Sequence, residues 1–398
     1  MLYHPQAFDQ LTDRPWGEGW VRERIAEVVA DVEAAHDPVA LWPADEWDSW
    51  QTPTPLKSLF AGAAGVVWGL AALRRRGHAE CSLDLAAIAR DALDVWRAEP
   101  DYMRGYVRPS PARAALLAGE TGILTVAWQL SAAADVADTL FERVTENAEN
   151  EANEIMWGSP GTMLAAQAMH EWTGEARWRD AWRKSADALL ASRDGDGLWT
   201  QRLDGKPSRC LGPVHGLVGN VLALLGGNLD AARCATLVSG TVAVLERCSV
   251  WEDGLVNWPG YEGSDLVRRD GGISLQWCHG APGIVVSTAS YLPEELLLAG
   301  AELTWTAGPH RDEKGAGICH GTAGNGYALL KAFARTGDEL WLERTRAFAV
   351  HALEQVDRLR ERRGRGRYSL WTGDVGVALY GADCLDARAR YPILDTWE

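Results

Sequence analysis

The tripeptide Cys-His-Gly occurs twice in the second half of the chain, as Cys278-His279-Gly280 and as Cys319-His320-Gly321. Thiolate and imidazole are ligands that zinc prefers, and a zinc site with three protein ligands keeps a fourth position open for a substrate. A single buried cysteine is more often a small core residue than a ligand. The repetition of the tripeptide nevertheless predicts that both thiols and a neighbouring imidazole form one metal site. We interpret the remaining cysteines as structural: Cys81, Cys210, Cys234, Cys248 and Cys384.

A third histidine occupies the equivalent place, because His215 stands directly before Gly216 as His279 and His320 stand before their glycines. If the three turns are equivalent in the fold, these imidazoles face the same opening. An imidazole with a pKa near neutrality is a natural proton donor or acceptor beside a metal site. The alternative is a core histidine bonded to a backbone carbonyl.

Two glycines separated by two residues recur through the whole chain, each time followed by a short apolar run. Successive pairs are 39 to 64 residues apart. One pair is weak evidence in a chain with 41 glycines, but seven such pairs indicate an internal repeat. The pairs are Gly62/Gly65, Gly119/Gly122, Gly158/Gly161, Gly216/Gly219, Gly280/Gly283, Gly321/Gly324 and Gly373/Gly376.

Each repeat is expected to contain two helices, a polar-faced one and a more apolar one that begins at the glycines. Without a Cβ atom, the paired glycines let the chain turn sharply and pack closely where the apolar helices converge. The pattern predicts an all-α fold, an α/α toroid with seven outer and seven inner helices in one domain over residues 1–398. The Pro- and Trp-rich stretch Asp37–Pro55 should be a loop between the first outer and inner helices. Amphipathic segments with helical period include Val21–His36, Leu83–Arg97, Arg177–Ser192 and Leu340–Leu359.

The charge and composition of the chain limit its partners. A net charge of −16 disfavours nucleic acid and anionic membrane surfaces as partners. The basic run Arg360–Arg367 has the opposite sign, and we interpret it as a solvated helix end. No signal-peptide pattern opens the chain, and no apolar stretch approaches the about 20 residues of a membrane span, so we expect a cytoplasmic protein. Seven scattered cysteines favour thiol or metal chemistry over disulfides.

The sequences around the glycine pairs resemble those of the lanthionine synthetase C-like family. The two cysteine turns, WCHGAPG and GICHGTAG, are the most specific part of this resemblance. VHGLVG, EIMWGSPG, SLFAGAAG and YSLWTGDVG are similar to other turns of the family, so that the resemblance covers nearly the whole chain. It implies that Cys278, Cys319 and His320 bind Zn²⁺, with His279 beside the metal and a water or thiol in the fourth position.

The resemblance also implies roles for three residues away from the metal. His215 matches a histidine proposed to handle protons, and Glu154 stands where the peptide cyclases of the family carry an aspartate. Lys314, five residues before Cys319, resembles a lysine of the branch that handles glutathione. Ser274 departs from the pattern, because a peptide cyclase is expected to carry an arginine there. This departure and the WCHG turn place the chain nearer the general, glutathione-type branch.

The implied activity is the addition of a thiol to the β-carbon of dehydroalanine or dehydrobutyrine in a peptide or protein. The nucleophile would be a small thiol such as glutathione or a peptide cysteine, with zinc lowering the pKa of the thiol. His215 would protonate the α-carbon. In the glutathione-type branch, the dehydro residue can first be formed by phosphate elimination, with Lys314 as base or phosphate contact.

Two other classes of protein fit parts of the sequence. A sensor or adaptor would bind zinc and a small thiol without turnover. A carbohydrate enzyme of toroid fold would explain twenty tryptophans as sugar-stacking residues. That enzyme needs paired carboxylates, and Glu120 and Asp374 are the only acidic residues that lie inside one of the seven glycine pairs.

Overall fold

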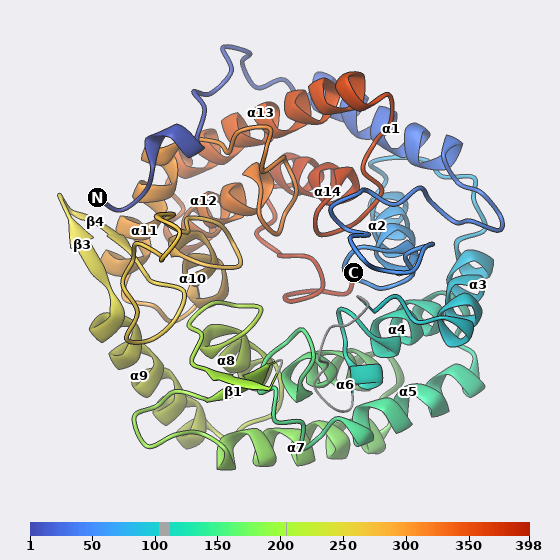
Figure 1. Ribbon diagram of the computed structural model, residues 1–398, viewed down its shortest axis with the longest axis horizontal. Coiled ribbons are helices and arrows are strands. Elements are labelled where there is room, and N and C mark those ends of the chain that lie inside the picture. The colour runs from blue at the N-terminus through green and yellow to red at the C-terminus, as the bar shows by residue number, and fades with distance from the viewer. Residues whose placement is uncertain (103–111, 204) are drawn as a thin grey trace.

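The chain forms two concentric rings of helices (Figure 1). The structure is a computed structural model that describes residues 1–102, 112–203 and 205–398, and fourteen α-helices lie within these ranges. Inner and outer helices alternate along the sequence, which confirms the predicted toroid. The inner helices are α2 (Ala63–Arg75), α4 (Glu120–Ser131), α6 (Ser159–Thr173), α8 (Leu217–Leu225), α10 (Ala281–Thr288), α12 (Thr322–Thr336) and α14 (Asp374–Leu385). The outer helices are α1 (Glu18–Ala34), α3 (Leu85–Ala98), α5 (Ala134–Glu146), α7 (Ala176–Ala191), α9 (Ala231–Cys248), α11 (Glu294–Ala307) and α13 (Glu339–Arg363).

Each inner helix begins at a glycine pair, and the first glycine is its N-cap. The second glycine lies against the preceding repeat. A Cβ atom on Gly122 would lie 2.7 Å from the Leu59 side chain, and one on Gly324 would lie 3.2 Å from Trp277. A Cβ atom on Gly65 would lie 2.9 Å from Leu370, so the last repeat packs on the first and the ring closes. Side chains at these positions would force neighbouring repeats apart.

Short strands are the part of the fold that the sequence did not indicate. β1 (Gln201–Leu203) pairs antiparallel with β2 (Lys206–Ser208), with Gln201 opposite Ser208. β3 (Val250–Glu252) pairs antiparallel with β4 (Leu255–Asn257), with Val250 opposite Asn257. Strands of three residues are too short to show a period of two, so they carry no periodic signal. The described part of the chain also contains the short 3₁₀ helices η1 (Pro5–Ala7) and η2 (Ala112–Ala114).

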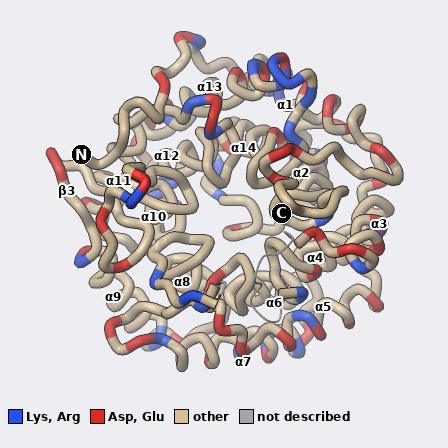
Figure 2. Tube along the Cα trace, in the orientation of Figure 1, with Lys and Arg blue, Asp and Glu red and all other residues tan. Residues whose placement is uncertain are grey.

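The main hydrophobic core lies between and within the two rings. Figure 2 shows that charged residues gather on the outer helices and the loops, while the inner helices carry few. Several of the tryptophans are fully buried and therefore serve packing rather than ligand stacking: Trp68, Trp178, Trp199, Trp258, Trp277 and Trp371. None of the helices within the described ranges is both long and apolar enough to cross a membrane.

The segment after α14 turns into the centre of the ring (Figure 1). Trp397 lies edge-on to Trp68 of α2 and to Trp172 of α6. On another side of the ring, Lys331 of α12 forms a 2.6 Å ion pair with Asp395. The C-terminal segment, residues 386–398, therefore fills part of the space that the inner helices enclose.

Candidate active site

Backbone hydrogen bonds join the turns that precede the inner helices of neighbouring repeats. The Cys278 N–H donates to the Cys319 carbonyl at 3.4 Å, and the Cys319 N–H donates to the Trp371 carbonyl at 2.8 Å. The Trp371 N–H in turn donates to the Phe60 carbonyl at 3.3 Å. Each of these residues stands two places before the first glycine of its pair. Equivalent residues thus become neighbours, which brings together two cysteines that are 41 residues apart in sequence.

Cys278, Cys319 and His320 form one cluster at this position. One ligand atom from each lies within 4.8 Å of the others. Both cysteines are buried, whereas His320 is partly exposed. Two sulfurs and one imidazole nitrogen are the donor set of a zinc site with an open position, so these residues fit a zinc ion.

The pKa values of the two thiols are shifted in opposite directions. Hydrogen bonding to Cys319, helped by the nearby imidazole of His320, holds the pKa of Cys278 well below its ordinary value. Burial raises the pKa of Cys319 well above its ordinary value. The pair therefore favours one thiolate next to one thiol. Gln276, which is also buried, donates from Nε2 to the Cys278 sulfur at 3.0 Å and stabilises the thiolate form.

His215 and Glu154 form a second pair, contributed by adjacent repeats. His215 Nδ1 lies 2.8 Å from Glu154 Oε2. Glu154 is fully buried and also accepts backbone N–H groups of Met156 at 3.0 Å and Trp157 at 2.5 Å. A carboxylate fixed in this way orients the ring of His215 and favours a proton on Nδ1. Glu154 is therefore placed to position His215 rather than to act on a substrate directly.

His279 lies between this pair and the cysteines. Its ring centre is 6.4 Å from that of His215 and 6.1 Å from that of Tyr261. Burial lowers the pKa of His279, which favours the neutral imidazole. Its Nδ1 is buried and has no hydrogen-bond partner among the described residues. The geometry groups Cys278, Cys319 and His320 as candidate ligands, and His279 is not part of that cluster.

Lys314 and Ser274 lie at the edge of the site. Lys314 is exposed, and its backbone N–H donates to the Arg311 carbonyl at 3.0 Å. Burial and then the positive charge of Lys314 lower the pKa of His310 to about 3. Ser274 Oγ accepts a hydrogen bond from Arg268 at 3.3 Å, so the guanidinium of Arg268 lies at the residue where a peptide cyclase of the family would be expected to carry an arginine.

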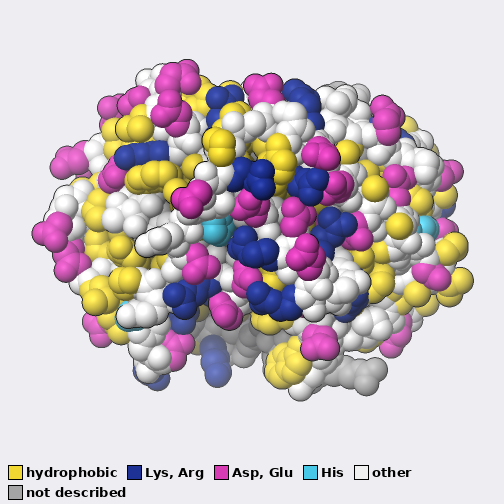
Figure 3. All heavy atoms as spheres, turned by 90° about the horizontal axis from the view of Figure 1, so that it is seen from above, with side chains coloured by type: hydrophobic (Ala, Val, Ile, Leu, Met, Phe, Trp, Pro, Cys, Tyr) yellow, Lys and Arg dark blue, Asp and Glu magenta, His cyan; other side chains and the backbone are white. Residues whose placement is uncertain are grey.

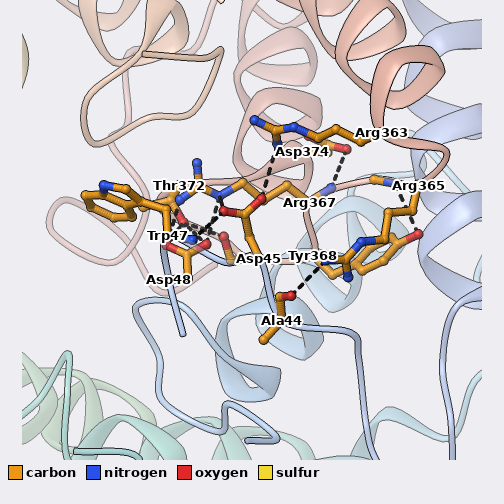
Figure 4. A network of polar contacts seen from close by, with 12 residues as sticks. Ala44, Asp45, Trp47, Asp48, Arg363, Arg365, Arg367, Tyr368, Thr372 and Asp374 are labelled. Atoms are coloured by element: carbon orange, nitrogen blue, oxygen red, sulfur yellow. Dashed lines mark hydrogen bonds and ion pairs between the residues drawn. The ribbon is translucent and has the colours of Figure 1, made fainter. Parts of the chain in front are cut away.

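An aromatic ring from a distant loop lies against the candidate ligand His320. The ring centre of Trp47 is 5.4 Å from that of His320, and the Arg367 guanidinium lies 5.3 Å over the same indole (Figure 4). Asp48, whose side chain is 2% exposed, binds Arg367 at 2.7 Å and Thr372 at 2.9 Å. We name Asp48, Arg367 and Thr372 the loop clamp. It fixes the 37–55 loop beside the cysteine turns and holds an exposed tryptophan in place.

The basic run at the end of α13 does more than face solvent, contrary to our interpretation of the sequence. α13 ends at Arg363, four arginines of the run pair with acidic residues of other segments, and Arg365 donates to the Ala44 carbonyl at 3.0 Å. In Figure 3, basic and acidic side chains alternate over the edge of the toroid seen from above. The run therefore connects segments of the protein. Its ion pairs are Arg360–Asp31, Arg362–Asp312, Arg363–Asp45, Arg367–Asp48 and, at 3.9 Å, Arg367–Asp45.

Asp48→Asn should loosen the 37–55 loop, because it removes the carboxylate that lies 2.7 Å from the buried guanidinium of Arg367 and leaves only the 3.9 Å pair with Asp45. We expect amide hydrogen exchange in residues 43–52 to rise at least about tenfold, since local opening becomes easier. Asp135→Asn is the matched control, because it removes the carboxylate of an exposed ion pair, Arg90–Asp135 at 3.4 Å. An exposed ion pair contributes little to stability. Unchanged exchange in Asp48→Asn would show that other contacts hold the loop.

Gln276, Trp47 and the loop clamp were not predicted from the sequence. Gln276 had a usable signal, because it stands four residues before Gly280, as Glu154 stands four residues before Gly158. A polar residue at that place in the repeat therefore points to the same region. Trp47 and Asp48 have no such signal, since they lie in a loop outside the repeated turns.

Comparisons with known proteins agree with this geometry. The family described as "Lanthionine synthetase C-like protein" matches residues 44–395. The chain is 30% identical over 197 residues to glutathione S-transferase LANCL1 of Danio rerio, which covers 46% of this chain and 45% of that protein. It is 30% identical over 242 residues to LanC-like protein GCL1 of Arabidopsis thaliana, covering 56% of this chain and 53% of that protein.

The chain thus spans about half the length of these two relatives in the alignments. Nisin cyclase has the same fold, with a TM-score of 0.57 at 13% identity, over 92% of this chain and 94% of that one. The family match covers most of the repeats and both cysteine turns. This chain belongs to the lanthionine synthetase C-like family.

Proposed function

We propose that this protein adds a thiol to the β-carbon of a dehydroalanine or dehydrobutyrine residue in a peptide or protein. The observation that carries the proposal is the convergence of Cys278, Cys319 and His320, with ligand atoms within 4.8 Å. Membership of the family supports thiol-related, thioether-forming chemistry in general. The specific substrates and the dependence on zinc are part of the proposal.

Cys278, Cys319 and His320 would hold the zinc ion. When bound, zinc supplies a lowered pKa for the substrate thiol, so that a thiolate is available near neutral pH. The two cysteine ligands together balance the charge of Zn²⁺, which leaves a substrate sulfur electron-rich. Gln276 holds the Cys278 sulfur in place through its 3.0 Å hydrogen bond.

His215 is the proposed acid of the reaction. The substrate sulfur forms a bond to the β-carbon, and the electron pair of the double bond moves to the α-carbon as an enolate. The α-carbon of the enolate then takes a proton from His215. The proton that the thiol released returns His215 to its protonated form. Glu154 keeps the imidazole oriented and stabilises its protonated form through the 2.8 Å contact at Nδ1.

One of the relatives suggests the nature of the nucleophile. The name of the zebrafish relative is that of a glutathione S-transferase, which supports a small thiol such as glutathione. Nisin cyclase is named as a cyclase of nisin, and its likeness to this chain is one of fold alone. We therefore favour a small thiol as nucleophile, with a dehydrated peptide or protein as partner. A cytoplasmic location would keep such thiols reduced.

Lys314 has a secondary place in the proposal. It is exposed, and its charge reaches Cys319 and His310 at the edge of the cysteine turns. We propose that it contacts phosphate, or acts as the base, if the dehydro residue is first made by eliminating phosphate from a modified serine or threonine. That step breaks the bond between the β-carbon and oxygen and removes the α-proton.

The experiment that tests the function is mass spectrometry of a dehydroalanine-containing peptide incubated with glutathione and the purified protein. Adduct formation should be faster with the protein than without it, and a zinc chelator should remove the acceleration. Protein that contains zinc and binds the thiol but gives no acceleration would favour the sensor or adaptor function instead.

The carbohydrate enzyme receives no support from the side chains on which it depended. Glu120 is buried and paired with Arg97 at 2.8 Å and with Arg143 at 3.1 Å. Asp374 is buried and accepts the Arg367 backbone N–H at 3.1 Å. Both carboxylates are thus held by contacts within the protein.

A further inference from the structure

Tyr391, in the C-terminal segment that enters the ring, lies directly beneath the cysteine turns. Its side chain is fully buried. The phenol ring stacks on the indole of Trp277, with centres 4.7 Å apart and planes 12° apart. The Tyr391 hydroxyl donates a hydrogen bond to the Ile318 carbonyl at 2.7 Å. The ring also lies 5.8 Å from that of Trp371.

Each of these three contacts is next to a cysteine. Trp277 directly precedes Cys278, and Ile318 directly precedes Cys319. The Trp371 carbonyl accepts the backbone N–H of Cys319 at 2.8 Å. One side chain therefore touches all three turns, from three successive repeats, that determine where the two thiols lie.

The C-terminal segment holds Tyr391 through contacts that do not involve the cysteine turns. The Tyr391 N–H donates to Asp395 Oδ2 at 2.8 Å, and the same carboxylate pairs with Lys331 at 2.6 Å. Further along, Trp397 packs on Trp68 and Trp172. The position of Tyr391 is thus fixed by residues outside the two cysteine turns, so its side chain can hold those turns in place.

From this arrangement we infer that Tyr391 is a positioning residue for the metal centre, which keeps the backbones of Cys278 and Cys319 at the separation that a shared metal requires. The inference rests on the proposed zinc site. Groups that orient metal ligands without binding the metal themselves affect metal affinity, because a ligand that can move out of position binds less tightly. Without the phenol hydroxyl, the turn at Ile318 loses its bond to the C-terminal segment.

Tyr391→Phe tests the inference, with Tyr380→Phe as the matched control. Tyr380 is also fully buried, and its hydroxyl also donates to a backbone carbonyl, that of Thr345 at 2.8 Å. That bond joins α14 to the outer helix α13, away from the cysteine turns. Tyr391→Phe removes the bond to the Ile318 carbonyl, whereas Tyr380→Phe removes the bond to the Thr345 carbonyl and a 2.7 Å contact with Thr345 Oγ1. The control therefore loses at least as much buried hydrogen bonding, so effects on stability and on metal binding can be separated.

The measurements are the zinc dissociation constant, by competition with a chromophoric chelator, the absorption spectrum of the cobalt(II)-loaded protein, and thermal unfolding of the metal-free protein. Tyr391→Phe should weaken zinc binding about tenfold and shift the thiolate-to-cobalt absorption bands. Tyr380→Phe should lower the unfolding temperature but leave the zinc affinity and the cobalt spectrum as in the wild type. Tyr391→Leu, which also removes the stacked ring, should weaken zinc binding further.

An unchanged zinc affinity and cobalt spectrum in Tyr391→Phe would overturn the inference alone. Equal loss of zinc affinity in Tyr391→Phe and Tyr380→Phe would also overturn it, because the effect would then follow stability. If the wild-type protein did not bind zinc, the proposed function itself would fail, together with the inference that rests on it.

Discussion

Replacing Cys319 with alanine should abolish zinc binding. The cluster offers three donor atoms within 4.8 Å, and removal of one thiolate leaves too few ligands for a zinc site with an open position. The zinc affinity should fall by more than the roughly 10- to 100-fold that follows loss of a residue that only hydrogen-bonds to a metal ligand. Cys278→Ala and His320→Ala should behave in the same way. The zinc content of the purified proteins, measured by mass spectrometry of the metal, checks this result.

Two cysteines away from the cluster serve as controls. Cys384 is fully buried, and burial raises its pKa to about 12, so its thiol is a core group. Cys384→Ala and Cys81→Ala should both retain one zinc per chain. Stoichiometric zinc in all three of the ligand variants would end the assignment of the metal site.

His215→Ala should retain zinc but lose turnover. His215 bonds to Glu154 and is not one of the three residues whose ligand atoms cluster, so the proposed ligands remain in place. If His215 is the acid that protonates the α-carbon, its loss should lower the rate about 10²- to 10⁴-fold. Thioether formation with a dehydroalanine peptide, followed by mass spectrometry, measures the rate.

His170→Ala is the control for His215→Ala, because His170 lies on the inner helix α6 but bonds to the Glu175 carbonyl at 3.1 Å, outside the site. It should keep full activity. Glu154→Gln should lower the rate and change its pH profile without loss of zinc, since the imidazolium loses its carboxylate partner. Full activity in His215→Ala would move the proton-transfer role to another group, with His279 the next to be tested.

Much of the fold could be predicted from the sequence, because the pattern that marks each repeat lies within a short stretch of the chain. Paired glycines mark where each inner helix begins, and the periodic apolar residues mark the outer helices. Leu83–Arg97 and Arg177–Ser192 were expected as outer helices, and the structure has α3 and α7 at residues 85–98 and 176–191. The long stretch from Asp37 to Pro55 was expected as a loop, and no helix lies there.

The residues proposed as zinc ligands could also be found from the sequence, since their turns share the Cys-His-Gly tripeptide. His215 was found by the same equivalence of turns. The residues that support them could not be found in this way. Asp48 acts on the site through Arg367, which is 319 positions later in the chain, and only the folded backbone makes them neighbours.

By itself, the sequence determined the number of repeats, the order of helices and the identity of the candidate ligands, because each depends on residues within one repeat. Only the tertiary structure decided which turns meet and what holds them. Closure of the ring places Trp371 and Phe60 next to each other, with a 3.3 Å hydrogen bond between residues 311 positions apart. The C-terminal segment then enters the ring and places Tyr391 beneath both cysteine turns. Contacts of this kind depend on packing between distant segments, and no local pattern of residue types encodes them.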